Sequence, residues 1–152
     1  MDAGCNFQVS VLGESYSQVP AIFQEAYTRL GSHIINWGHQ ETKHKYYEIL
    51  ASSHVVVSTA KHEFYGVAML EATYCGCFPL CPNHLVYPEL YPSECLYQDK
   101  QQLFQMLQKF SVDPNLSRTM RKNMQIDLTK FNADNLINDY KQVLYPNNEE
   151  NL

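Results

Sequence analysis

A continuous apolar run, His54 to Ser58, constrains the fold of this chain more than any other feature. Its sequence, His-Val-Val-Val-Ser, has no polar alternation, which is typical of a strand covered on both faces of a sheet. A loop, a helix over 66–74 and a second short strand, Cys77 to Cys81, follow it directly. Strand, helix and strand in this order predict a parallel sheet with a right-handed crossover.

The rest of the chain continues this alternation, at about one strand–helix unit per 20 to 25 residues. We therefore predict an α/β fold, a Rossmann-like parallel sheet of four strands flanked by helices, with extra helices at the C-terminus. Pro79 and Pro82 should limit pairing of the last strand. The other expected elements are strands at Phe7–Gly13 and His33–Trp37, a helix at Val19–Leu30 ended by Gly31, a helix capped by Thr42 to Leu50, a short turn at Val86–Tyr91, a helix capped by Asp99 to Phe110, a helix opened by Asp113 and Pro114, and a helix at Ala133–Leu144 capped by Asn132.

Composition bounds the class of protein. The 152 residues are 45% hydrophobic and 18% charged, which predicts one globular domain, over 1–145, followed by a frayed polar tail at 146–152. There is no apolar run near the roughly 20 residues that span a bilayer, and no secretory signal is visible. Five cysteines, an odd number, favour a reduced chain in the cytoplasm, with the nucleus as a second compartment.

The formal net charge of −5 argues against a main nucleic-acid clamp within this chain. A protein that binds the phosphate backbone usually carries a dense basic face. Two small basic spots are present, and we interpret them as solvated helix faces. They consist of Lys43, His44 and Lys45, and of Arg118, Arg121 and Lys122.

Two carboxylates and a glycine between the two strands form a candidate ligand site. Gly66 lets the backbone approach a ligand, and the helix that it opens has a positive end that attracts phosphate. Glu63 lies in the loop before that helix. Glu71 lies five residues beyond Gly66, or ~7 to 8 Å along the helix, where a carboxylate could accept hydrogen bonds from both hydroxyls of a ribose. Ordinary packing of a helix with one outward glutamate is the alternative.

A retaining glycosidase is a second chemical interpretation of the two carboxylates. In such enzymes a pair about 5 Å apart serves as acid/base and nucleophile. The glycine-led helix N-terminus has no role in that scheme, so we rank it below a transferase. Cys75, Cys77, Cys81 and His84 invite a zinc site, but the first two should diverge between a helix end and a buried strand. We predict small hydrophobic side chains there, and we interpret most of the 11 tyrosines as packing residues.

The stretch resembles the acid-x7-acid region of the retaining, GT-B-fold glycosyltransferases of family 4. That family shares a run of the form S-x-x-E-G-F-G-L-x-x-x-E-A-x-x-x-G-x-P-V. Within it the chain is most similar to the branch that mannosylates queuosine in tRNA, over roughly residues 7 to 110. The matching runs are Phe7 to Glu14 (Phe-Gln-Val-Ser-Val-Leu-Gly-Glu), Trp37-Gly38, His62 to Ala72 (His-Glu-Phe-Tyr-Gly-Val-Ala-Met-Leu-Glu-Ala), Tyr74 to Pro82 (Tyr-Cys-Gly-Cys-Phe-Pro-Leu-Cys-Pro) and Leu85 to Pro92 (Leu-Val-Tyr-Pro-Glu-Leu-Tyr-Pro).

The resemblance implies a donor site for GDP-mannose. Glu71 should bind the nucleotide ribose, and Glu63 should be the catalytic residue beside the donor sugar. The backbone at Tyr65, Gly66 and Val67 should face the diphosphate. The implied acceptor is queuosine at the wobble position of the tRNA-Asp anticodon.

The same resemblance extends the donor site to the end of the second strand and to the loop before the helix. Gly38 and His39 occupy the place that usually lines the base pocket, although His39 and Gln40 replace what the branch carries there. Trp37 could be core or pocket wall. Lys61 could partly replace a basic clamp on the diphosphate, or it could face solvent.

The implied reaction retains configuration and needs no metal or cofactor, because the leaving phosphate takes the acceptor proton. The sequence also has no Asp-x-Asp pair of the metal-binding type. Family members carry an N-terminal domain for the acceptor, a first strand, and an Arg and a Lys that hold the diphosphate, none of which is recognised here. We therefore expect a donor half that contacts tRNA mainly through that missing domain. The alternative is a non-catalytic, truncated isoform that binds a nucleotide or a partner.

Overall fold

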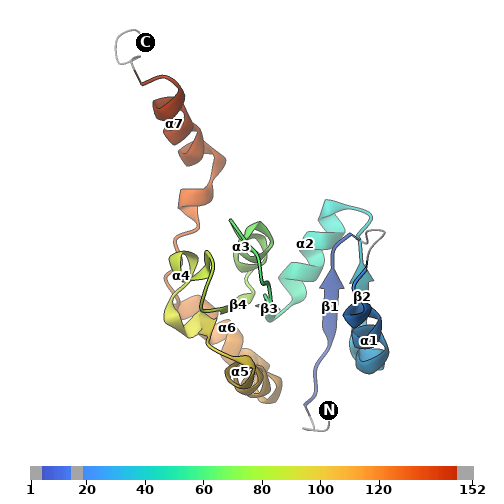
Figure 1. Ribbon diagram of the computed structural model, residues 1–152. Helices are drawn as coiled ribbons and strands as arrows, with labels where there is room; N and C mark the ends of the chain where they lie inside the picture. Colours follow the sequence, from blue (N-terminus) through green and yellow to red (C-terminus); the bar gives the residue numbers. More distant parts are fainter. Residues whose placement is uncertain (1–4, 15–18, 147–152) are drawn as a thin grey trace.

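The computed structural model describes residues 5–14 and 19–146, in which strands alternate with helices and every strand pair is parallel (Figure 1). The predicted α/β class is confirmed. The strands are β1 (Val9–Leu12), β2 (Ile34–Gly38), β3 (Val55–Val57), β4 (Phe78–Pro82) and β5 (Leu96–Tyr97). The helices are α1 (Ala21–Leu30), α2 (Lys43–Ser52), α3 (Val67–Tyr74), α4 (Tyr87–Leu90), α5 (Lys100–Val112), α6 (Pro114–Asn123) and α7 (Ala133–Leu144), with short 3₁₀ turns η1 (Gly31–His33), η2 (Ser93–Cys95) and η3 (Thr129–Phe131).

The described strands form two parallel sheets where the sequence predicted one sheet of four strands. Their orders are β1-β2 and β3-β4-β5, and the two-residue β5 was not foreseen. Helix α2 lies between the two sheets in Figure 1. Leu12 of β1 packs against the small apolar cluster to which Leu50 of α2 and Cys77 belong. Side-chain packing thus joins β1 to the other half of the molecule.

The expectation that His54 to Ser58 is covered on both faces is wrong. Val55 and Val56 are only half-buried, and Val57 is 39% exposed. The strand is three residues long and lies at the edge of its sheet, with β4 as its strand partner. An edge strand has a neighbour on one side only, so its side chains lose much of their cover.

Strand β4 is buried throughout and pairs on both sides, over three residues with β3 and over two residues with β5, so the prolines limit its pairing without placing it at an edge. The Phe78 N–H donates to the carbonyl of His54 on the β3 side at 2.9 Å. Successive residues of a strand point their N–H groups to opposite sides, so the missing N–H of Pro79 faces the β5 side. There the pairing begins only at Cys81 with Leu96. The proline therefore leaves no ladder donor unfilled.

Three of the predicted N-caps are confirmed. The side chains of Thr42, Asp99 and Asp113 accept hydrogen bonds from backbone N–H groups in the first turns of α2, α5 and α6. Such caps contribute about 1 kcal/mol each. Asn132 precedes α7 as predicted, but its side chain makes no cap hydrogen bond.

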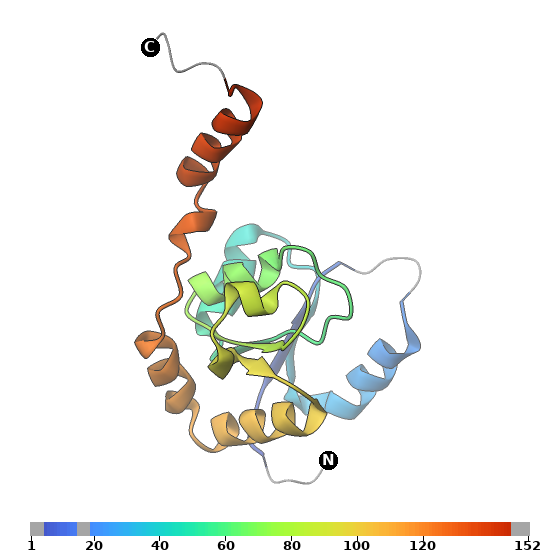
Figure 2. The same ribbon diagram turned by 60° about the vertical axis from the view of Figure 1, so that its left-hand side comes forward.

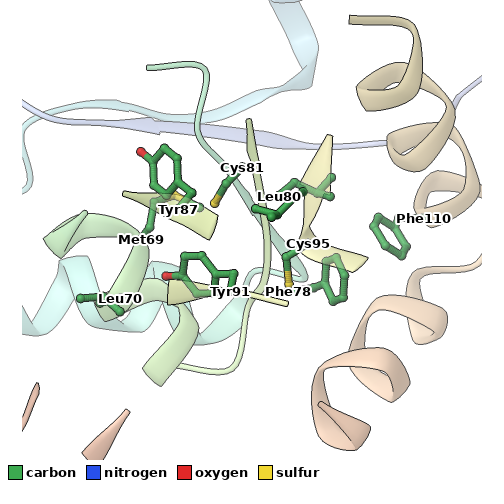
Figure 3. Packing of buried hydrophobic residues seen from close by; sticks show 10 residues of the cluster. Met69, Leu70, Phe78, Leu80, Cys81, Tyr87, Tyr91, Cys95 and Phe110 are labelled. Carbon is green, nitrogen blue, oxygen red and sulfur yellow. The ribbon is translucent and has the colours of Figure 1, made fainter. Parts of the chain in front are cut away.

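The core lies where α3, α4 and α5 meet β4 (Figure 3). Phe78 is fully buried and its ring centroid is 5.1 Å from that of Phe110 on α5. Met69 and Leu70 of α3 pack on the same cluster. Burial of these side chains fixes α3 against the sheet, and this positions the loop that precedes the helix.

Helix α7 stands away from the sheets in both ribbon views (Figures 1 and 2). Its apolar residues Ile137, Tyr140 and Val143 are exposed. Of the predicted tail, 146–152, all but Pro146 lies outside the described residues, and the predicted domain boundary stays a prediction. No helix in the described part of the chain has the length and apolar content needed to cross a membrane.

Candidate functional site

Two buried tyrosines hold the end of β3, where the candidate loop begins. The Tyr97 hydroxyl donates to the Ser58 carbonyl at 2.8 Å, and the Ser58 hydroxyl lies 2.7 Å from the Tyr87 hydroxyl. The Ser58 hydroxyl also accepts from the N–H of Ala60 at 3.2 Å. Sequence analysis gave these tyrosines no role in the site, because no local pattern shows which hydroxyl a buried tyrosine will meet.

Gly66 is the N-cap of α3 and has φ +78°, ψ +32°, a left-handed conformation. A Cβ at this position would lie 3.3 Å from Leu90 Cδ1 and 3.5 Å from Tyr87 Cε1. Helix α3 therefore starts where the sequence predicted. The glycine is needed both for its backbone conformation and for close packing against α4.

The Glu63 carboxylate lies over the backbone N–H groups that precede α3. Its Oε1 accepts from the N–H of Phe64 at 3.0 Å and from that of Tyr65 at 3.2 Å. A hydrogen bond from the Gly66 N–H, followed by those of Tyr65 and Phe64, lowers the pKa of Glu63. A negatively charged carboxylate is thus held by consecutive amides at a helix N-terminus, which is the geometry that binds anions.

Glu71 lies on α3 and faces α2. Its Oε2 accepts from the Tyr46 hydroxyl at 3.1 Å, and its Oε1 accepts from the Tyr47 hydroxyl at 2.9 Å. The sequence led us to interpret most tyrosines as packing residues, and it gave these two no role in the site. The sequence showed only two adjacent tyrosines on the helix before β3, and nothing in it indicated that they contact Glu71.

The remaining predicted positions are spread more widely. Val67 begins α3 and is 54% exposed, and Lys61 is exposed in the loop. Gly38 ends β2 with φ +88°, and its carbonyl accepts from Gly13 N–H and Gln40 Nε2, each at 3.2 Å. The structure therefore brings Glu63, Tyr65, Gly66 and Val67 into one turn and puts Glu71 on the same helix. It places Gly38 on the other sheet.

His39 lines an open hollow of about 520 Å³ at the start of α2. The other lining residues are Gln40, Glu41, Thr42, His44, Lys45 and Glu48, and none of them belongs to the Glu63–Glu71 stretch. The His39 Nδ1 lies 3.9 Å from a carboxylate oxygen of Glu14. Its predicted part in a base pocket stays a prediction.

Several residues outside this stretch serve packing. Trp37 is half-buried and meets Tyr27 edge to face, at 5.0 Å between ring centroids. Arg121, from one of the two basic spots, donates to the Thr73 carbonyl near the end of α3 through Nε at 3.3 Å and Nη2 at 3.0 Å. This guanidinium therefore caps a helix instead of being solvated.

The buried cysteines fill apolar space, as predicted for Cys77 and Cys81. Burial raises the pKa of the Cys77 thiol to about 11 and that of Cys95 to about 12, which keeps both neutral. The Cys77 thiol donates to the Leu50 carbonyl at 3.1 Å. Within the ranges 5–14 and 19–146, no three His, Cys, Asp or Glu side chains gather as a metal site would require.

The chain is 41% identical, over 140 residues, to the tRNA-queuosine alpha-mannosyltransferase of Drosophila melanogaster. It is related to part of a tRNA-queuosine mannosyltransferase. The predicted resemblance is confirmed by this relative, and the α/β fold with parallel sheets agrees with a partial GT-B domain. The matched region takes in 91% of this chain and 37% of the fly protein, so the chain spans little more than a third of that relative's length. No protein-family model matches the chain.

Proposed function

We propose that this chain binds GDP-mannose and forms the donor side of a retaining glycosyltransferase that mannosylates queuosine in tRNA. The observation that carries the proposal is the anion site at the start of α3, found in a chain 41% identical to a tRNA-queuosine alpha-mannosyltransferase. Two of the three backbone positions that the resemblance assigns to the diphosphate, Tyr65 and Gly66, are among the amides that hold the Glu63 carboxylate.

In this proposal the diphosphate replaces Glu63 at the amides of Tyr65 and Gly66, and Val67 supplies the next N–H. A phosphate oxygen and a carboxylate oxygen are both anionic acceptors, so the same backbone geometry serves either group. The displaced Glu63 carboxylate then lies beside the mannose ring, where a negative charge stabilises the cationic character that develops on the sugar. Lys61, exposed in the same loop, adds a positive charge near the phosphates.

The other donor contacts are the ribose and the base. Glu71 accepts hydrogen bonds from the ribose hydroxyls, and the backbone at Gly38 and His39 borders the guanine. We place the base contact on the hollow beside His39, which lies at the carboxyl end of β2. Ligands of open α/β sheets bind outside the carboxyl ends of the strands.

The chemical step that we propose needs no enzyme nucleophile and no metal. The bond between mannose C1 and the β-phosphate oxygen breaks, and a bond from an acceptor hydroxyl oxygen to C1 forms on the same face. The acceptor proton passes to the leaving diphosphate oxygen, so GDP departs with that proton and the configuration is retained. Residues of this chain orient the donor and stabilise charge during this step.

We assign the tRNA mainly to the part of the relative that lies beyond the matched 37% of its length. The formal charge of −5 fits this division, because phosphate-backbone binding relies on clustered Lys and Arg. A nucleotide- or partner-binding module without turnover is the second candidate. This candidate is favoured because both carboxylates already accept hydrogen bonds within the chain, Glu63 from backbone amides and Glu71 from two tyrosine hydroxyls.

Calorimetric titration of the 152-residue chain with GDP-mannose tests the proposal. We expect saturable heat for the wild type, a loss of about tenfold in affinity for Glu71→Gln, and no heat with UDP-glucose. Absence of heat with GDP-mannose would refute the donor site. A mannosylation assay on queuosine-containing tRNA then separates the candidates, because a module that only binds leaves the tRNA unmodified.

A further inference from the structure

We propose that Tyr46 and Tyr47 position the Glu71 carboxylate for a ribose cis-diol, with Tyr46 as the fixed donor and Tyr47 as the donor that a ribose hydroxyl replaces. This inference rests on the proposed function and assigns two residues to it. Each tyrosine hydroxyl meets a different carboxylate oxygen, at 3.1 Å for Tyr46 and 2.9 Å for Tyr47. Both carboxylate oxygens are therefore held by neutral donors from one helix, α2.

The two tyrosines differ in how firmly they are placed. Tyr46 is half-buried and packs against the apolar cluster of Leu50, Ala72 and Cys77. Tyr47 is 37% exposed, and its ring is tilted at 59° to that of Tyr46, with 5.3 Å between the centroids. A packed ring keeps its hydroxyl in place, whereas an exposed ring can turn away from Glu71 at little cost. This difference assigns the fixed and the exchangeable role.

The carboxylate keeps acceptor capacity for a ligand. An ionised carboxylate offers about four lone-pair positions, and the two tyrosines use two of them. Among the residues that the structure describes, no Lys, Arg or His forms an ion pair with Glu71. Its negative charge is thus not neutralised by a cation, which favours hydrogen bonding to neutral hydroxyls such as those of a ribose.

The contact with Glu71 also affects the pKa values of both tyrosines. Burial, followed by the charge of Glu71, raises the pKa of Tyr46, and the hydrogen bond to Glu71 raises the pKa of Tyr47. A tyrosine hydroxyl of ordinary pKa is already protonated at neutral pH, and the raised pKa values keep both hydroxyls as donors into more alkaline solution. Loss of the Glu71 charge and of its two hydrogen bonds should therefore change the surroundings of both tyrosine hydroxyls.

The first test needs no nucleotide. With the chain labelled at tyrosine ¹³Cζ, a nucleus that reports on phenol hydrogen bonding, we expect the Tyr46 and Tyr47 resonances to move in Glu71→Gln. The Tyr74 resonance, from an 82% exposed side chain on the same helix as Glu71, should stay in place. Unmoved Tyr46 and Tyr47 resonances would overturn the inference whether or not the chain binds GDP.

The second test compares GDP with 2′,3′-dideoxy-GDP by calorimetry. We expect Tyr46→Phe to weaken GDP binding about fivefold and to leave dideoxy-GDP binding unchanged, because only GDP offers hydroxyls to Glu71. Tyr47→Phe should bind GDP as tightly as the wild type or more tightly, and Tyr74→Phe serves as the control. If the wild type prefers GDP over dideoxy-GDP and Tyr46→Phe keeps that preference unchanged, the inference is wrong and the donor site stands. If the wild type binds neither nucleotide, or both equally, the ribose role of Glu71 fails and the inference fails with it.

Discussion

Replacing Gly66 by alanine tests the backbone geometry on which the site depends. The left-handed conformation at φ +78° costs a residue with a Cβ roughly 1 to 2 kcal/mol, and the smaller entropy of the unfolded alanine chain offsets about 0.5 kcal/mol of that. The new Cβ would also lie 3.3 Å from Leu90 Cδ1, so the α4 side chain must shift, at about 1 kcal/mol. We expect Gly66→Ala to lower the free energy of unfolding by about 2 kcal/mol in total.

Gly38→Ala is the matched control, because Gly38 has φ +88° and a Cβ there would meet nothing within 4 Å. It should lose only the backbone part, about 1 kcal/mol. In thermal unfolding followed by circular dichroism, these losses correspond to about 4 to 8 °C for Gly66→Ala and about 2 to 4 °C for Gly38→Ala. Equal losses would show that Gly66 does not pack against α4. No loss in Gly66→Ala would refute the left-handed start of α3.

Two further variants test the site loop and the core. We expect Glu63→Gln to have a lower free energy of unfolding than the wild type near neutral pH. The difference should shrink as the pH falls through the pKa of Glu63, which lies below its usual value of about 4.3, because the bonded carboxylate stabilises the fold only while it is ionised. A difference that stays constant between pH 7 and pH 3 in urea titrations would contradict the hydrogen bonds to the amides. Phe78→Ala should lower the free energy of unfolding by about 3 to 5 kcal/mol, whereas Phe64→Ala, at a 96% exposed side chain, should stay within about 0.5 kcal/mol of the wild type. Similar losses in both variants would contradict the core in Figure 3.

Local chemistry made much of the fold predictable. Thr42, Asp99 and Asp113 cap the helices that follow them because their side chains reach N–H groups only two or three residues away. Gly66 lies at the end of its loop in a left-handed conformation, and a glycine in the sequence is enough to predict such a position. The order of strands and helices was predictable for the same reason, because the spacing of apolar residues within each segment indicates its secondary structure.

What the sequence could not show depends on contacts between distant segments. The division into two sheets and the exposure of Val57 follow from which strands find partners, and an apolar run does not reveal that. Glu63 was placed near a sugar, yet it lies on backbone amides of its own loop. Tyr46 meets Glu71 across 25 positions of the chain, a pairing that no spacing rule encodes.

The central claim is that the turn from Glu63 to Val67, together with Glu71, binds a nucleoside diphosphate sugar. Amide chemical-shift mapping of the ¹⁵N-labelled chain during titration with GDP-mannose tests it most directly. The account predicts that the largest shifts occur at Tyr65, Gly66, Val67 and Glu71, with smaller ones at Gly38 and His39. Shifts confined to the hollow lined by His39 and the start of α2, or no shifts at saturating ligand, would contradict it.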